Sequence, residues 1–256
     1  MKKLRGIFLK NEKELGLMRE AGRIVSRILD EIASQVRPGV PTMLFEETAR
    51  RMCRDFGVKP AFLGYLGFPY AICCSVNEVV VHGFPSADRI LKDGDIVSID
   101  MGVIHQGFHG DSARTFAVGQ ISPQAERLMR VTEESLHKGI AQALSGNNLY
   151  DVSGAVQACV EEAGFGVVRR FVGHGIGVKL HEKPEIPNFV PKGLSGITLK
   201  PGMCLAIEPM VTEGAYEVEI LEDRWTAVTK DRKLAAHFEH TVAVTADGPV
   251  ILTRSE

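Results

Sequence analysis

The sequence reads Leu-Lys-Asp-Gly-Asp-Ile-Val-Ser-Ile-Asp from Leu91 to Asp100, and Leu-Lys-Pro-Gly-Met-Cys-Leu-Ala-Ile-Glu from Leu199 to Glu208. The two stretches align without a gap, and each places an acidic residue at the end of an apolar run. A Leu-Lys-x-Gly motif can be no more than a turn before a strand. Because both acidic residues fall at the same offset, we interpret the pair as an internal repeat that brings Asp100 and Glu208 together at a pseudo-twofold axis.

Each half of the chain is predicted to hold two helices followed by strands. Asn11 and Glu14 form a capping-box pattern ahead of apolar residues at helical spacing, and Ser122-Pro123 begins a helix in the second half. The predicted helices follow Asn11 and cover about 43–55, 123–144 and 150–163, and the predicted strands cover 71–76, 79–81, 96–101, 114–118 and much of the chain after Gly164. The fold class is therefore α+β, a single domain of residues 1–256 with its repeat at about 11–118 and 122–253.

The composition is that of an ordinary globular protein. The chain has 256 residues, of which 45% are hydrophobic and 24% charged, and its net charge of −2 gives no electrostatic reason to expect nucleic acid or a membrane surface as the main partner. No apolar run is long enough for a membrane span or a signal peptide. The five cysteines are odd in number and lack a C-x-x-C spacing, so we expect a reducing cytoplasm rather than a disulfide framework.

Acidic residues and one histidine from five separate segments are candidates for a metal site. They are Asp100, Asp111, His174, Glu208 and Glu239. Taken singly, each has an ordinary interpretation, such as a turn aspartate, an edge-strand glutamate or a loop histidine between glycines. An ionised carboxylate is costly to bury unless it is paired or binds a metal, so acidic residues beside apolar runs together favour metal ligation.

The ligand types indicate the kind and number of ions. Oxygen ligands with one imidazole suit cations such as Mn²⁺, Fe²⁺, Co²⁺ or Zn²⁺. Two divalent ions would neutralise four carboxylates, and a pair about 3.5–4 Å apart can share a bridging hydroxide that is nucleophilic at neutral pH. The predicted chemistry is therefore hydrolysis of an amide or ester at a centre of two divalent metal ions.

Two further histidines are candidates for substrate binding. His82 ends an apolar strand before a Gly-Phe-Pro turn, and His181 follows His174 closely in the chain. Either could also be a surface histidine. The remaining histidines are expected to be structural: His105, His109, His137, His237 and His240.

These motifs closely resemble those of the bacterial type I methionine aminopeptidases, which belong to the pita-bread metallopeptidases. The resemblance covers about residues 11–253 and rests on the segments 75–83 (SVNEVVVHG), 99–102 (IDMG), 110–115 (GDSART), 173–177 (GHGIG), 207–209 (IEP) and 238–241 (FEHT). It implies a pita-bread fold, in which helix-helix-strands units repeat about a pseudo-twofold axis and form a central curved antiparallel sheet with helices on its outer face.

The resemblance also implies how the metals are held. Asp100 would bind one ion, and His174 with Glu208 would bind the other. Asp111 and Glu239 would bridge both ions. Glu208 would, in addition, handle the proton of the bridging water.

The implied reaction is removal of the initiator methionine from new polypeptides whose second residue is small. The bridging metal hydroxide would attack the scissile carbonyl. His82 and His181 would hydrogen-bond the scissile peptide, and His181 would do so at the carbonyl oxygen as it becomes an oxyanion.

The resemblance places the methionine pocket at Phe62, Tyr65, Phe68, Cys73, Leu180 and Trp225. Aromatic and sulfur-containing walls suit a thioether side chain, although residues 62–69 could equally belong to the core. Leu180 stands where the family commonly has an aromatic residue, and Phe62 where it commonly has a smaller one. Both departures bear on the shape of the pocket.

The implied partners are nascent polypeptides that begin with methionine. The basic start, Lys2, Lys3 and Arg5, could contact ribosomal RNA, although such a start is more often a solvated tail. A monomer is expected, with no DNA or membrane partner.

Two other functions are left open. A proline-directed relative, such as aminopeptidase P or prolidase, shares the five-ligand pattern but has an additional N-terminal domain that is not expected here. A catalytically silent pita-bread protein that binds nucleic acid or histones would have lost ligands, whereas all five are present in this sequence.

Overall fold

The structure is a computed structural model that describes residues 2–4 and 6–254, with side chains described for 6–254. The side chains of Lys2, Lys3 and Arg5, on which the predicted contact with ribosomal RNA depends, lie outside this part of the chain. The helices are α1 (Glu12–Gln35), α2 (Met43–Asp55), α3 (Pro123–Ala141), α4 (Leu149–Glu162) and the short 3₁₀ helix η1 (Tyr65–Gly67). The strands are β1 (Lys2–Leu4), β2 (Ile7–Leu9), β3 (Lys59–Pro60), β4 (Cys73–Val76), β5 (Val79–Val81), β6 (Ile96–His105), β7 (Phe108–Ala117), β8 (Gly166–Val167), β9 (Gly173–Gly175), β10 (Glu182–Ile186), β11 (Cys204–Ile207), β12 (Met210–Thr212), β13 (Val218–Ile220), β14 (Ala227–Thr229), β15 (Ala235–His237), β16 (Glu239–Thr245) and β17 (Gly248–Ile251).

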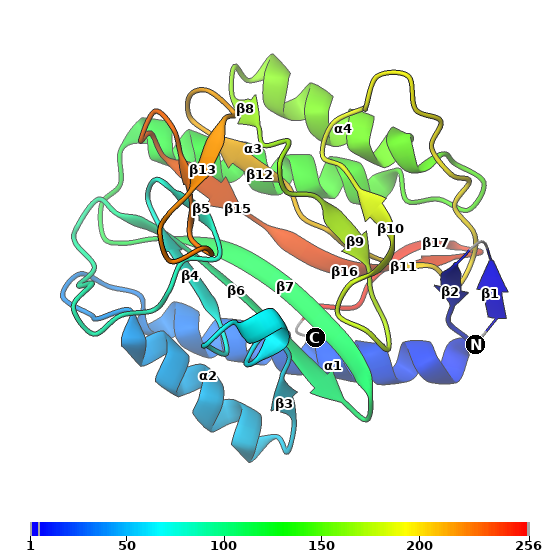
Figure 1. The fold of residues 1–256 in the computed structure, drawn as a ribbon, viewed down its shortest axis with the longest axis horizontal. Coiled ribbons are helices and arrows are strands. Elements are labelled where there is room, and N and C mark those ends of the chain that lie inside the picture. Colours follow the sequence, from blue (N-terminus) through cyan, green and yellow to red (C-terminus); the bar gives the residue numbers. More distant parts are fainter. Residues whose placement is uncertain (1, 5, 255–256) are drawn as a thin grey trace.

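One large antiparallel sheet joins the two halves of the chain (Figure 1). Its strands follow the order β10-β9-β11-β16-β7-β6-β3, with β17 beside β16 and β4 beside β6. Helix α1 packs against β6 and β7, whereas α3 packs against β11 and β16. The halves meet where β7 pairs with β16, and Glu239 stands opposite Ala113 at this junction.

The helices begin where the sequence predicts. The Asn11 side chain accepts a hydrogen bond from the Glu14 backbone N–H, and the Glu14 carboxylate accepts one from the Asn11 N–H, which confirms the capping box of α1. Ser122 caps α3, and Pro123 occupies its first turn, where a missing N–H removes no helical bond. A second capping box, formed by Asn148 and Asp151, begins α4.

The same turn precedes β6 and β11. Gly94 has φ +94° and Gly202 has φ +89°, a left-handed backbone that favours glycine. The Gly94 N–H donates to Val118 O and the Gly202 N–H donates to Val244 O, both at 2.9 Å. Each turn therefore delivers its strand to the sheet in the same way.

The sequence suggested that the acidic residues of the first half lie at strand ends, because they adjoin apolar runs. The structure places them within strands instead. Asp100 lies in the middle of β6, opposite Ala113, and Asp111 lies within β7, opposite Gly102. The two strands continue to a tight turn at Gln106 and Gly107, which both have positive φ. The apolar pattern therefore predicts strands that are too short, because β6 and β7 remain paired beyond Asp100 and Asp111.

The core is divided between the two halves. One cluster packs α1 and α2 against β4 and β6 around Phe45 and Ile99, and a second packs α3 and α4 against β11 and β16 around Leu136 and Val242. No helix among residues 6–254 is long and apolar enough to cross a membrane.

Candidate metal centre

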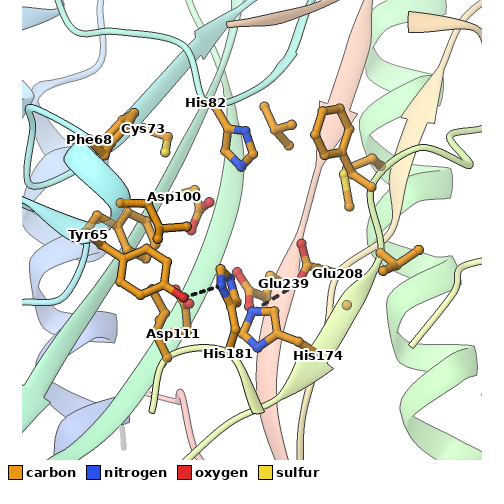
Figure 2. A pocket seen from close by; sticks show the side chains of 18 of the residues that line it. Tyr65, Phe68, Cys73, His82, Asp100, Asp111, His174, His181, Glu208 and Glu239 are labelled. Atoms are coloured by element: carbon orange, nitrogen blue, oxygen red, sulfur yellow. Dashed lines mark hydrogen bonds and ion pairs between the residues drawn. The ribbon is translucent and has the colours of Figure 1, made fainter. Parts of the chain in front are cut away.

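Five neighbouring strands bring the predicted ligands to one cavity. In sheet order they are His174 on β9, Glu208 directly after β11, Glu239 on β16, Asp111 on β7 and Asp100 on β6. All five side chains line a cavity of about 620 Å³ (Figure 2). Because adjacent strands are held in register by backbone hydrogen bonds, the sheet itself sets the spacing of these groups.

The ligand atoms lie close enough to share a cation. Atoms of Asp111, His174 and Glu239 all lie within 4.8 Å of one another. Glu208 joins them, since its Oε1 lies 3.5 Å from His174 Nε2. Asp100 interacts electrostatically with Asp111, Glu208 and Glu239.

The carboxylates are unfavourable in this position without a cation. One oxygen of each of the four, on Asp100, Asp111, Glu208 and Glu239, is buried and has no hydrogen-bond partner among the described residues. Burial, and then repulsion between them, raises the pKa of three of these groups well above the ordinary range, and burial raises the pKa of Asp111 to about 7. Orphaned anionic oxygens beside an imidazole fit a divalent-metal site.

His174 is prepared to act as a ligand. Its Nδ1–H donates to the carbonyl oxygen of Gly175 at 2.9 Å, which leaves the lone pair on Nε2 facing Glu208. Burial is the main cause that lowers the pKa of His174 to about 3, so the ring stays neutral. A neutral imidazole held by a bond at its other nitrogen is the usual form of a metal-binding histidine.

The two candidate substrate histidines line the same cavity. The ring of His181 stands edge-on to His174, with 4.3 Å between ring centroids, and its Nδ1 lies 2.9 Å from the Tyr65 hydroxyl. His82 has φ +61° and contacts the rings of Phe171 and Trp225. Burial lowers the pKa of His82 to about 4, so it is neutral at physiological pH.

An apolar slot adjoins the cluster of acids. All six residues of the predicted methionine pocket line the cavity: Phe62, Tyr65, Phe68, Cys73, Leu180 and Trp225. The rings of Phe68 and Trp225 meet edge to face, with 5.0 Å between centroids. Cys73 pairs with Asp100 across β4 and β6, so the sheet register joins the slot to the acidic cluster. Leu180 is 3% exposed, so it forms part of the wall of the slot and not its opening.

Sequence reasoning missed one histidine beside the cluster. His237, expected to be structural, is 2% exposed, and its Nε2 lies 3.8 Å from Glu208 Oε2. That nitrogen has no hydrogen-bond partner among the described residues. The His-x-Glu spacing of His237 and Glu239 was the available signal. In contrast, His109 and His240 make bonds to Gly177 O and Thr253 Oγ1 that suit a structural role.

Comparison with known proteins identifies the family. The model of metallopeptidase family M24 matches residues 16–246. The chain belongs to metallopeptidase family M24. It is 54% identical to a methionine aminopeptidase of Clostridium perfringens, over 96% of this chain and 98% of the relative, and 51% identical to methionine aminopeptidase 1 of Bacillus subtilis, over 97% and 99%.

Solved structures agree with this assignment. The methionine aminopeptidase of Thermotoga maritima superposes with a TM-score of 0.95 at 46% identity, covering 97% of this chain and 100% of that one. The predicted resemblance to bacterial methionine aminopeptidases is confirmed, and so is the pita-bread fold. An Xaa-Pro dipeptidase of Bacillus anthracis is 22% identical with a TM-score of 0.77, and this chain covers only 62% of it, so it shares the fold alone.

Proposed function

We propose that this M24 metallopeptidase removes the N-terminal methionine from polypeptides whose second residue is small. One observation carries the proposal: the cavity lined by four carboxylates, each with one buried oxygen, and by His174 also contains an aromatic slot with a cysteine at its wall. An acidic metal site supplies hydrolytic chemistry, and the slot suits a thioether side chain. The names of the relatives support both parts, and the preference for a small second residue rests on the resemblance to them.

We further propose that two divalent ions, Co²⁺, Mn²⁺, Fe²⁺ or Zn²⁺, bind here. Asp100 would hold one, His174 and Glu208 the other, and Asp111 and Glu239 both. The charge of two divalent ions matches that of four carboxylates, each of which has one buried oxygen without a hydrogen-bond partner among the described residues. When bound, such ions would polarise the scissile carbonyl and lower the pKa of a water molecule.

The chain's own residues would manage protons and orientation. Glu208, a carboxylate in the lining of the same cavity, would carry the proton released from water. His82 and His181 would donate hydrogen bonds to the scissile peptide, His181 to its carbonyl oxygen. Both rings line the cavity beside the slot, where that peptide must pass.

The setting of the reaction is also part of the proposal. The whole chain would form one catalytic domain of repeated halves, a division that the matching turns before β6 and β11 support. Its substrates would be nascent chains in the cytoplasm. The enzyme would act on them as a monomer, close to the ribosome.

The decisive assay compares peptides that differ only at the second residue. We expect the purified protein to release methionine from a Met-Ala peptide and not from a Met-Lys peptide, and to leave an Ala-Pro peptide intact. Chelation should abolish release, and added Mn²⁺ or Co²⁺ should restore it. Activity that survives thorough chelation, or preferential cleavage of the Ala-Pro peptide, would contradict the proposal.

A further inference from the structure

Tyr65 contacts two parts of the cavity: its ring lines the slot, and its hydroxyl reaches His181 beside the acidic cluster. The hydroxyl oxygen lies 2.9 Å from His181 Nδ1, and the two rings meet edge to face with 5.2 Å between centroids. Figure 2 shows this contact bridging the two walls of the cavity. Tyr65 belongs to η1 and His181 precedes β10, so the bond joins the two halves of the chain.

The backbone of Tyr65 is held firmly enough to direct its hydroxyl. The Tyr65 N–H donates to Phe62 O at 2.9 Å, and the Phe68 N–H donates to Tyr65 O at 2.9 Å. Gly64 closes the same turn by donating to Phe68 O at 2.8 Å. These bonds hold the backbone from which the ring reaches His181, and the hydroxyl contact with His181 Nδ1 orients the ring itself.

The bond has a consequence for the other nitrogen of the ring. A neutral imidazole carries one N–H and one lone pair, and the bond made at one nitrogen selects which atom keeps the hydrogen. A phenol that donates to Nδ1 places the hydrogen on Nε2. Nε2 makes no hydrogen bond among residues 6–254, so it is the nitrogen open to a ligand. An N–H is favoured over a lone pair there, because the cavity is lined with carboxylates.

We infer that Tyr65 is a positioning residue for the reaction as well as a wall of the slot: its hydroxyl donates to His181 Nδ1 and so keeps the hydrogen on Nε2, where it can bond the carbonyl oxygen of the substrate. This inference rests on the proposed function. The two roles of the Tyr65 side chain can be tested separately, because Tyr65→Phe keeps the ring and removes only the hydroxyl.

Kinetics test the positioning role. We expect Tyr65→Phe to lower kcat for a Met-Ala peptide about 10-fold, the lower end of the about 10- to 100-fold loss that follows removal of a partner that orients a metal-binding histidine. KM should change less than about twofold because the wall is intact. Tyr70→Phe is the matched control: Tyr70 packs on Phe68 in the same region, and the cavity lining does not include it. That variant should leave both constants unchanged.

A double mutant shows whether Tyr65 acts through His181. In a His181→Ala background, Tyr65→Phe should lower kcat no further, because residues that act as a unit are not additive. An equal loss in both backgrounds would overturn the inference.

The tautomer can be observed without turnover. Histidine labelled with ¹⁵N in the protein loaded with diamagnetic Zn²⁺ distinguishes a protonated ring nitrogen from one with a lone pair, and His181→Ala assigns the signals among the eight histidines. We expect His181 to carry its hydrogen on Nε2 in the wild type and to become a mixture in Tyr65→Phe. Hydrogen on Nδ1 in the wild type, or an unchanged ratio in Tyr65→Phe, would overturn the inference. A wild-type protein that does not release methionine would instead refute the proposed function and leave this spectrum readable.

Discussion

Individual side chains of the acidic cluster are destabilising in the metal-free protein. Glu239 is 2% exposed and one of its oxygens has no partner among the described residues, so burial and neighbouring acids raise its pKa well above the ordinary value. The sequence indicates which residues could be ligands, because an acidic residue in an apolar run is chemically conspicuous. For His237 the only local signal is its spacing from Glu239, and that spacing does not show that Glu208 lies 3.8 Å away.

Removing one of these charges should have opposite effects with and without metal. We expect Glu239→Gln to raise the thermal midpoint of the metal-free protein by about 2–4 °C, the shift that corresponds to about 1 kcal/mol in a chain of this size. The same variant should bind Mn²⁺ more than about 10-fold less tightly, because a ligand is lost. Calorimetry in a chelator and titration with Mn²⁺ measure the two effects.

Glu47→Gln provides the control for this pair of measurements. Glu47 is an exposed glutamate on α2 and does not line the cavity. It should change neither the midpoint nor the affinity. A fall in the metal-free midpoint of Glu239→Gln would show that crowding of the acids is not the destabilising feature.

Among the elements, the loop that carries His181 and the turns at Gly94 and Gly202 depend on contacts with residues far away in the sequence. Lys10 follows β2, and its Nζ lies 2.6 Å from Glu182 Oε2, with both side chains almost completely buried. The other oxygen of Glu182 accepts the Lys179 N–H, so this pair fixes the backbone on both sides of His181. A side chain at Gly177 would displace the Lys10 side chain, since a Cβ there would lie 2.3 Å from Lys10 Cε.

Breaking the buried ion pair should therefore affect stability and the reaction. We expect Lys10→Met to destabilise the protein by about 3–5 kcal/mol, since it leaves a buried carboxylate without its partner. It should also lower kcat, because His181 loses its support. Lys138→Met, which removes an exposed ion pair with Glu134, should change the urea midpoint little. Equal midpoints for the two variants would contradict this account.

The two related turns offer a matched comparison. Gly94→Ala and Gly202→Ala both place a side chain at positive φ, which costs about 1–2 kcal/mol. At Gly202 the new Cβ would also lie 2.6 Å from Lys10 O, whereas at Gly94 the nearest atom is Gln120 O at 3.8 Å. Chemical denaturation should show a clearly larger loss for Gly202→Ala. Equal losses would mean that the approach of Lys10 adds no constraint.

At the scale of the whole molecule, the titrating groups make metal-free stability depend on pH. Four carboxyl groups have raised pKa values: Asp100, Asp111, Glu208 and Glu239. They hold protons in the folded state that the unfolded chain has already released, so their contribution to stability falls as pH rises through the folded pKa. Buried histidines act in the opposite direction, because the unfolded chain binds the proton first: His82, His174, His237 and His240.

These signs predict a stability maximum for the metal-free protein. The histidines make their full contribution to the free energy of unfolding above the ordinary histidine pKa of 6.5. Above that pH the carboxyl contribution changes most, by up to about 1.4 kcal/mol per pH unit for each group that still holds its proton. The buried cysteines, whose pKa values burial also raises, act in the same direction. We expect the free energy of unfolding in a chelator to decrease from pH 6.5 to pH 8.5.

Saturating Mn²⁺ should remove this decrease, since metal binding requires the deprotonated ligands. Urea denaturation at three pH values, with and without metal, measures the effect. A metal-free stability that rises over this range would show that the four acids are ionised in the folded protein.

Local sequence signals predict the starts of α1 and α3, the equivalent turns before β6 and β11, and the residue types of the candidate site. These signals are local: a cap joins residues three positions apart, and a glycine turn depends on its own φ. Long-range packing places Asp100 and Asp111 within a long hairpin, sets His237 beside Glu208, and brings Lys10 and Tyr65 to the segment around His181. Such contacts join residues far apart in the chain. They depend on strand register and on packing between the two halves, which no short stretch of sequence specifies.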